Sequence, residues 1–343
     1  MQAKGVVAAL VAWGMVWTGA AAAAERIEVP IRQTRVLPRL IHYSIPVSIA
    51  GGAPIEAMLD SGSTGLRLLP PAMPAQGLEE TDTGTIYSYG IGLKITGKVW
   101  EGEVSVGGAE TAGAIRIHAI SAIGCVPSKP KCPGAKTTID RFLLGGRGDP
   151  EHGYQAIIGV GLAPNAVVNP LAAIGDGVWI ITLPKPDQGK PGRLILNPTA
   201  EERAGFTMFQ LDRKDLNTPF GQMRGWDAHI PGCLVNANTK RSFCAPSLLD
   251  SGAPGMLAHS NKKSETDGWN SGAPALFAFV TNGKVIGSDG FLINMQPGSG
   301  FNVSERDEGP LERELKMGTL PYFSFDVLYD SKAGMIGLKK RTD

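Results

Sequence analysis

The chain contains the same tetrapeptide, Leu-Asp-Ser-Gly, twice, at 59–62 and at 249–252. Each copy follows apolar residues and is followed shortly by a glycine with an aliphatic neighbour. An apolar strand that ends in Asp-Ser-Gly predicts a tight turn, because glycine adopts backbone angles that other residues avoid. A single turn of this kind is explained by Asp and Ser capping their own backbone. Two copies in matching surroundings indicate a duplicated half, which would bring the carboxylates of Asp60 and Asp250 together.

Composition favours a loop-rich β protein. Glycine (45) and proline (25) are abundant among the 343 residues, whereas charged residues make up only 19%. With 43% hydrophobic residues, the chain can bury one large core or two moderate ones. The net charge of +1 gives no reason to expect nucleic acid or an anionic membrane as a partner.

Residues 1–24 are typical of a cleaved signal peptide. Lys4 supplies the positive start, an apolar run follows up to Trp17, and alanines precede Glu25. A membrane anchor is the competing interpretation, but the apolar run is short for a span of about 20 residues. No later stretch is long and apolar enough to cross a bilayer. We therefore expect a secreted or periplasmic protein that begins at Glu25.

Four cysteines fit an exported chain. Three pairings are possible in principle, and the local pairs Cys125–Cys132 and Cys233–Cys244 close the least chain. The alternative, a zinc site, is disfavoured because the spacing lacks a Cys-x2-Cys element.

Alternating or apolar segments between glycine-rich turns predict strands at 26–29, 40–47, 55–59, 85–89, 93–96, 99–106, 155–161, 179–183, 193–196, 207–211, 226–230, 242–249, 273–280, 285–286, 322–329 and 335–339. Gly97 is among the glycines expected to interrupt strands. Residues 169–174 predict a short helix, and Asn282-Gly283 predicts a hairpin turn. The charge-rich segment 304–316 predicts a solvated surface. The polar break at 199–203 predicts two lobes, 25–203 and 204–343.

These motifs, in this order, resemble those of the pepsin-like aspartic proteases. The resemblance spans nearly the whole mature chain and implies an all-β, bilobal fold with the active-site cleft between two β lobes. The motifs that carry it are Asp60-Ser61-Gly62-Ser63, Tyr89-Gly90-Ile91-Gly92, Ile157-Ile158-Gly159, Asp250-Ser251-Gly252-Ala253, Gly318 followed by Leu328-Tyr329-Asp330, and Met335-Ile336-Gly337-Leu338.

The resemblance implies a role for each motif. Asp60 and Asp250 would be catalytic, sharing a proton because two adjacent carboxylates do not both ionise easily. Ser61 and Ser251 would tie the two turns together across the lobes, and Ser63 would hydrogen-bond Asp60. The supporting glycines would be Gly62 and Gly252, and the β-hairpin flap that covers substrate would carry Tyr89, Gly90 and Gly92.

The function implied is an aspartic endopeptidase that binds a polypeptide in an extended conformation and activates a water molecule between the two aspartates. This chemistry needs no metal and no cofactor. We expect a monomer, because one chain already supplies both lobes.

Three residues depart from the family pattern. Arg67 replaces a tryptophan that in the family hydrogen-bonds the flap tyrosine. Ala253 replaces a Ser or Thr, which removes a hydroxyl donor from Asp250 and should raise the apparent pKa of the pair towards neutrality. Lys316 replaces an apolar residue. These departures keep open an alternative, a pepsin-fold binding or inhibitory protein with little or no catalytic activity.

Other hydrolytic chemistry is poorly supported. The Gly-x-Ser-x-Gly motif of many serine hydrolases is absent. The histidines show no pair with helical metal spacing, so we expect structural or surface roles for His42, His118, His152, His229 and His259.

Overall fold

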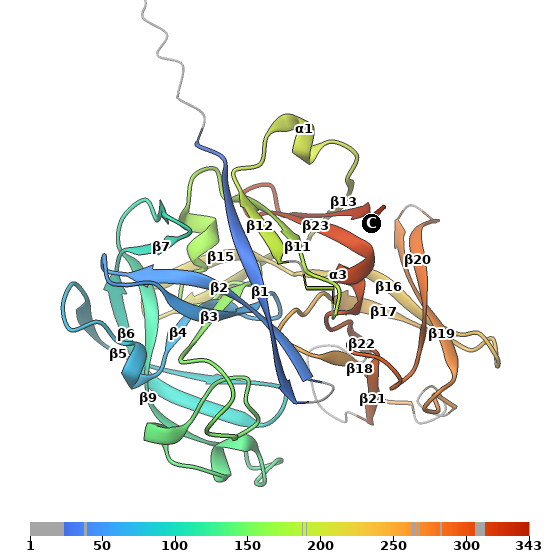
Figure 1. The fold of residues 1–343 in the computed structure, drawn as a ribbon, viewed down its shortest axis with the longest axis horizontal. Coiled ribbons are helices and arrows are strands. Elements are labelled where there is room, and N and C mark those ends of the chain that lie inside the picture. Colours follow the sequence, from blue (N-terminus) through green and yellow to red (C-terminus); the bar gives the residue numbers. More distant parts are fainter. Residues whose placement is uncertain are drawn as a thin grey trace, which may run out of the picture.

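The computed structural model describes residues 24–342, except 38–39, 187, 190, 263–264, 266–267, 282 and 306–312. Nearly all regular structure in these residues is β-strand. The N-terminal and C-terminal halves form two lobes side by side (Figure 1). The predicted signal peptide, apart from Ala24, lies outside the described residues. Within the described ranges, no helix has the length and apolar character needed to cross a membrane.

In the residues that the structure describes, the first half consists of twelve strands and short 3-10 turns. The strands are β1 (Ile27–Leu37), β2 (Leu40–Ile49), β3 (Ile55–Asp60), β4 (Thr64–Leu68), β5 (Glu79–Ser88), β6 (Leu93–Gly102), β7 (Val104–Val106), β8 (Ala109–Glu110), β9 (Ile115–Cys125), β10 (Ala156–Val160), β11 (Val178–Thr182) and β12 (Gly192–Leu196). The turns are η1 (Pro70–Ala72), η2 (Pro133–Ala135), η3 (Ile139–Arg141) and η4 (Pro170–Ala173).

The second half begins with a short helix and is again mostly strand. Its elements are α1 (Ala200–Arg203), β13 (Thr207–Gln210), β14 (Arg213–Thr218), β15 (Gly221–Trp226), β16 (His229–Asn236), β17 (Ser242–Leu248), β18 (Gly255–Ser260), β19 (Pro274–Thr281), β20 (Lys284–Leu292), β21 (Gly300–Glu305), β22 (Arg313–Lys316), α3 (Leu320–Ser324), β23 (Phe325–Asp330) and β24 (Met335–Lys340).

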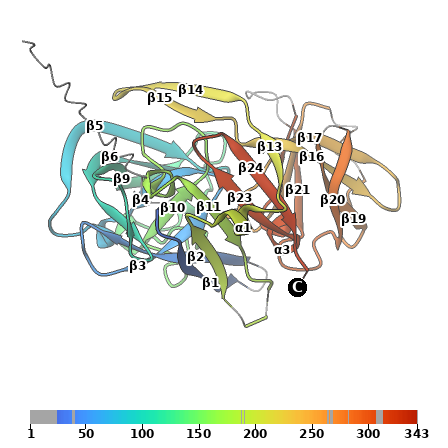
Figure 2. The ribbon, with the colours of Figure 1, turned by 90° about the horizontal axis from the view of Figure 1, so that it is seen from above.

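One large sheet joins the two halves. Its strand order is β13-β24-β23-β11-β12-β1-β2-β3-β10-β4-β9-β6-β5, so the last strands of the chain pair with strands of the first half. Figure 1 shows β11, β12 and β23 between the lobes. The hairpin β14–β15 extends back over the first half (Figure 2), where Trp226 N donates to Leu162 O (3.0 Å). The domain boundary at 203/204 stays a prediction, since strands from both sides of it share this sheet.

The duplication seen in the sequence extends to the strand topology. In the first lobe β10 lies between the two strands that flank the Asp-Ser-Gly turn, parallel to β3 and antiparallel to β4. In the second lobe β22 lies parallel to β17 and antiparallel to β18 in the same way. Each crossing strand therefore packs directly against one of the two turns. The approach is close, because a Cβ on Gly159 of β10 would lie 2.8 Å from the carbonyl carbon of Ser63.

Apolar side chains fill both lobes. The main cluster includes Trp179 and Tyr329, whose rings stack with centroids 5.6 Å apart, and it continues into the second lobe. A smaller cluster lies behind the cleft in the first lobe. It contains Met58, Leu69, Leu93, Ile95, Ile120, Phe142, Leu144, Tyr154 and Ile157. Two tyrosines of the hairpin β5–β6 pack against this smaller cluster, so the apolar core supports the hairpin that faces the site.

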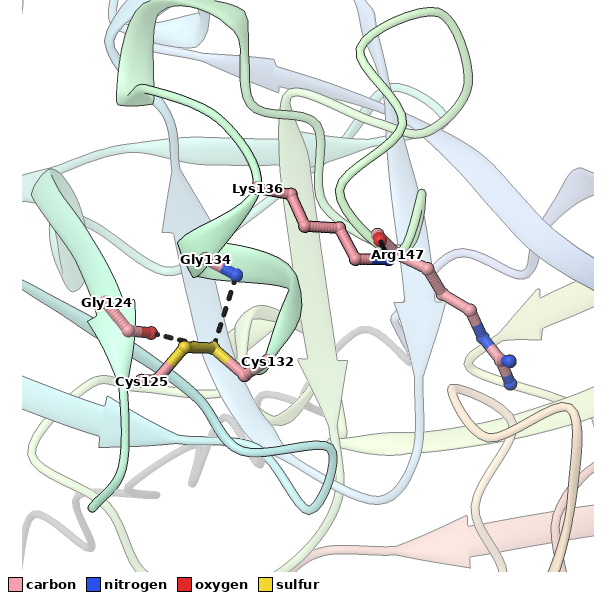
Figure 3. Close-up of a disulfide and its surroundings, with 6 residues drawn as sticks. All are labelled: Gly124, Cys125, Cys132, Gly134, Lys136 and Arg147. Atoms are coloured by element: carbon pink, nitrogen blue, oxygen red, sulfur yellow. Dashed lines mark hydrogen bonds between the residues drawn. A yellow bond between two sulfur atoms is a disulfide. The ribbon is translucent and has the colours of Figure 1, made fainter. Parts of the chain in front are cut away.

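Both predicted disulfides are confirmed. Cys233 and Cys244 bond across the paired strands β16 and β17, at a hairpin. Cys125 and Cys132 bond across the loop that follows β9, where Gly134 N donates to Cys132 Sγ (3.3 Å) (Figure 3).

Most predicted strands are confirmed, and the short helix at 169–174 is the 3-10 turn η4. Four details are wrong. The strand β6 continues through Gly97, because a bulge absorbs the irregularity there. The segment 226–230 is divided between two strands, β15 and β16. Tyr322 lies in helix α3 rather than in a strand. The charge-rich segment is not wholly solvated, since Glu314 is buried where β22 enters the sheet.

β19 and β20 form the hairpin expected at Asn282-Gly283, with Thr281 opposite Lys284, although Asn282 itself lies outside the described residues. The sequence patterns did not predict the long strand β9 or strand β14, and of β15 they predicted only its last residue, Trp226.

The close packing at Gly159 leads to a stability prediction. We expect Gly159→Ala to destabilise the fold by about 1–3 kcal/mol, because the added methyl group would overlap backbone atoms that have no room to move. Urea denaturation would measure this change. Gly124→Ala is the matched control, because a Cβ at Gly124 has no atom within 4 Å and its backbone angles suit alanine. Equal stability of the two variants would contradict the packing argument.

Candidate active site

The structure brings the two predicted catalytic aspartates together between the lobes. Asp60 ends β3, and Asp250 follows β17 at the equivalent place in the second lobe. A Cβ on Gly62 would lie 2.3 Å from Cγ of Asp250, and a Cβ on Gly252 would lie 2.5 Å from Oδ1 of Asp60. Each carboxyl group thus lies over the glycine of the opposite turn, and only glycine leaves room for it.

Two buried serines connect the turns through reciprocal hydrogen bonds. Ser251 Oγ accepts from Ser61 N (3.0 Å) and donates to Leu59 O (2.9 Å). Ser61 Oγ accepts from Ser251 N (2.9 Å) and donates to Leu249 O (2.9 Å). Both residues are buried. These four bonds hold the two aspartate turns in a fixed relation across the lobes.

Two tyrosines extend this network, and the sequence analysis missed both. Tyr322 Oη lies 2.6 Å from Ser61 Oγ, and Tyr329 Oη lies 2.6 Å from Tyr322 Oη. Because Ser61 gives its own proton to Leu249 O, the tyrosines donate in the direction Tyr329 to Tyr322 to Ser61. Burial raises the pKa of Tyr329 to about 12, so this tyrosine stays protonated and able to donate. The positions of the two tyrosines in the sequence gave no indication that they contact Ser61.

The two carboxyl groups have different hydrogen-bond donors. Asp60 accepts from Ser63 Oγ at Oδ2 (2.6 Å) and from Gly62 N at Oδ1 (2.9 Å). Asp250 accepts from the backbone N–H of Ala253 at Oδ1 (3.0 Å), and residue 253 has no hydroxyl that could match Ser63. The site is therefore asymmetric although the fold around it is duplicated.

The asymmetry is accompanied by a raised pKa. Burial, and then the neighbouring charge of Asp60, raise the pKa of Asp250 to about 7. The positive charge of Lys316 and the N–H of Ala253 act in the opposite direction. Asp250 consequently holds a proton at acidic pH, which is the state that a proton donor needs.

The predicted flap residues form the tip of the hairpin β5–β6. Gly92 N donates to Tyr89 O (2.8 Å), and Gly92 has a φ of +88°, which closes a tight turn. The loop closed by the Cys125–Cys132 disulfide holds this tip, with Lys129 Nζ donating to Gly90 O (2.6 Å) and Val126 N to Gly92 O (2.9 Å). The flap is thus attached at its turn to a covalently closed loop.

Arg67, which replaces the tryptophan of the resembled family, is buried beneath the flap. Its guanidinium carbon lies 3.8 Å from the ring centroid of Tyr87, and its Nη1 donates to Gly65 O (3.1 Å). The Tyr87 ring meets Tyr89 edge to face, with centroids 4.9 Å apart. The sequence analysis missed Tyr87, although the two-residue period of a strand places it on the same face as Tyr89.

A cavity of about 510 Å³ lies over the two aspartates and beneath the flap. Both aspartates, both flap tyrosines and His42 are among its lining residues. His42 lies against Gly145 O (3.1 Å) through Nε2, and burial lowers its pKa to about 4. Among the described residues, no three His, Cys, Asp or Glu side chains are grouped so that they could hold a metal ion.

Comparison with solved structures shows the fold. The chain is similar to the aspartic proteinase from Irpex lacteus, with a TM-score of 0.55 and 14% sequence identity over 93% of this chain and 98% of that chain. At this identity the similarity shows the fold alone. No protein-family model matches the chain, and no curated protein matches it by sequence. The all-β, bilobal fold expected from the motifs is confirmed.

The serine network leads to a second stability prediction. We expect Ser251→Ala to destabilise the protein by about 3 kcal/mol, because it leaves both Ser61 N and Leu59 O buried without a partner. Urea denaturation monitored by tryptophan fluorescence would measure the loss. Ser247→Ala is the control, because Ser247 is equally buried but donates only to Ala245 O in its own strand. If Ser247→Ala lowered the stability as much as Ser251→Ala, the bonds between the lobes would contribute no more than a bond within one strand.

Proposed function

We propose that the protein is an exported aspartic endopeptidase in which Asp60 and Asp250 activate water by general acid–base catalysis. The observation that supports this best is the pairing of the two carboxyl groups from duplicated turns, one of which has a strongly raised pKa. The similarity to an aspartic proteinase fold agrees with it. The leader-like residues 1–24 and the two disulfides support export.

The proposed reaction divides the two proton-transfer roles between the carboxyl groups. Asp60 accepts two hydrogen bonds from its own turn, as suits a carboxylate, and Asp250 carries the proton. Asp60 removes a proton from water as the water oxygen attacks the scissile carbonyl carbon, and Asp250 donates to the carbonyl oxygen. The tetrahedral intermediate then collapses. Asp60 donates the proton that it took from water to the leaving amine nitrogen, the C–N bond breaks, and Asp250 takes back its proton as the hydroxyl group becomes the carbonyl of the new carboxyl end.

The flap supplies the cover for this reaction. The polypeptide substrate lies extended in the cleft, under Tyr87 and Tyr89. Both tyrosines are held from behind, Tyr87 by the guanidinium of Arg67 and Tyr89 by the apolar cluster. Arg67 thus occupies the place of the missing tryptophan as a support for the flap.

The catalytic proposal predicts that Asp60→Asn and Asp250→Asn each reduce cleavage of an unfolded protein substrate by at least about a hundredfold. The reason is that each substitution leaves one carboxyl group, which does not perform both proton transfers. Pepstatin should block the wild-type activity. The assay would use residues 25–343 with both disulfides formed, at pH 3 to 7. Cleavage that survives both substitutions would refute the assignment of the pair, and a folded wild-type protein without activity would favour the binding-protein alternative.

A stability measurement shows whether these variants are folded. The folded pKa of Asp250, about 7, lies above its ordinary value of 3.8, so the carboxylate reduces stability as pH rises through this interval. We expect Asp250→Asn to melt at a higher temperature than the wild type at pH 8, and we expect the difference to vanish at pH 3. A lower melting temperature at pH 8 would contradict the burial of an ionisable pair.

The pH profile tests the contribution of residue 253. Activity should decrease as pH rises through about 7, because Asp250 then loses the proton that it donates. We expect Ala253→Ser to move this decrease to lower pH, because an added hydroxyl donor favours the ionised carboxylate. Ala253→Gly, which adds no donor, is the control. The measurement is kcat/KM against pH, and a profile of Ala253→Ser that does not move would show that the hydroxyl does not reach Asp250.

A further inference from the structure

The cleft carries an excess of positive charge. Besides the two aspartates, its lining in the described part of the chain contains no acidic residue, yet it contains Lys129, Arg147 and Lys316. When the pair of aspartates holds one proton, these three cations leave the cleft with a net positive charge. Clefts with walls of low dielectric constant concentrate such a field and attract groups of opposite charge.

Lys129 is already engaged, since its Nζ donates to the flap carbonyl Gly90 O. The other two cations are available to substrate. They lie on opposite lobes, Lys316 on β22 of the second lobe and Arg147 in the loop after η3 of the first.

Lys316 lies close to the reacting groups. Its positive charge lowers the pKa of Asp250, and 24% of its side-chain surface is exposed. Its Nζ lies 4.0 Å from Oε1 of Glu314, and the same oxygen lies closer, at 3.3 Å, to Nε2 of His229. Lys316 is therefore weakly paired in the protein, and its ammonium group can bind an oxygen of a substrate that lies beside Asp250.

The contact that fixes Arg147 is made by its backbone, and its charged side chain takes no part in it. Lys136 Nζ donates to Arg147 O (3.0 Å), and the side chain extends away from that contact (Figure 3). Its guanidinium group makes no hydrogen bond or ion pair within the part of the chain that the structure describes, and the residue is exposed. Arg147 lines both the main cavity and an adjoining cavity of about 370 Å³, whose described lining also contains no acidic residue.

We propose that the cleft selects polypeptides with acidic side chains near the cleavage point, and that Lys316 and Arg147 are the residues that determine this specificity. A guanidinium group binds a carboxylate through two parallel hydrogen bonds, and an ammonium group binds one as a point charge. Basic peptides are repelled by the same field. This inference rests on the proposed function and deepens it, because the acid–base chemistry of the two aspartates needs no cation in the cleft.

The test compares peptides that differ only in charge. Fluorogenic peptides capped at both ends, so that only side chains carry charge, would contain Glu or Gln at each position around one cleavable bond. At pH 6, where Glu is ionised, we expect about a tenfold higher kcat/KM for Glu at the selected positions. The ratio should approach 1 at pH 3.5 as Glu becomes protonated, and it should decrease with added salt.

Three variants locate the effect. Lys316→Met and Arg147→Met should each bring the Glu/Gln ratio close to 1 at one position of the peptide. Lys332→Met makes the same charge change at an exposed turn outside the cavity and should leave the ratio intact. Because the Glu/Gln ratio compares two peptides on the same variant, any effect of Lys316 on the acidity of Asp250 cancels. A wild-type ratio near 1, or a ratio that all three variants lower equally, would overturn the proposal.

A binding measurement separates this proposal from the catalytic one. Fluorescence anisotropy with the Asp250→Asn variant would give Kd for the same Glu and Gln peptides without turnover. Tighter binding of the Glu peptides, lost in Asp250→Asn combined with Lys316→Met or Arg147→Met, would support the specificity even if the wild type cleaved nothing. Equal Kd values, together with equal cleavage of both peptides by the wild type, would refute the specificity and leave the protease assignment in place. Uncapped Gln peptides show whether a terminal carboxylate can replace the side chain, and an advantage confined to them would overturn the side-chain assignment.

Discussion

The site depends on the reciprocal hydrogen bonds between Ser61 and Ser251. Two carboxyl groups that are buried together destabilise each other when ionised, so the protein must hold them against that repulsion. The serine bonds do this, because each hydroxyl accepts from an N–H of the opposite turn and donates to a carbonyl of the opposite lobe, and all of these groups are buried. Breaking one bond would leave a buried polar group unpaired, which is more costly than the bond itself is stabilising. These reciprocal hydrogen bonds are possible because the fold is duplicated.

Much of this site could be predicted from the sequence, since its parts are local. Each copy of Asp-Ser-Gly after an apolar strand predicts a turn on its own. The duplication then predicts that the two turns lie next to each other. The local disulfides were readable for a similar reason, as each closes a short segment. The hairpin tip at Tyr89 followed from its glycines. In each of these cases a few neighbouring residues determine the geometry.

The features that were missed involve contacts between segments far apart in the chain. Tyr322 reaches Ser61 because helix α3 lies under the first turn, and no spacing near either residue indicates that contact. Strand β9 was overlooked although its residues alternate, and with it the pairing that places His118 opposite Arg67. Burial, and then the charge of Arg67, lower the pKa of His118 to about 3. His118 therefore stays neutral, and Arg67 carries the positive charge beneath the flap. The sequence identified Arg67 as a departure, and the structure shows which ring it supports.

Two further departures offset each other at Asp250. Ala253 removes a neutral donor that would have favoured the carboxylate, whereas Lys316 adds a positive charge that favours it. Both lie where the crossing strand of the second lobe meets the turn, since a Cβ on Gly318 would lie 3.1 Å from Ala253 O. A hydroxyl at position 253 would act on Asp250 alone, but a lysine ammonium also faces the cleft. Under the proposed mechanism, the exchange would keep Asp250 acidic enough to share its proton and would give the cleft a positive charge that acts on substrates, so Lys316 would contribute to both catalysis and specificity.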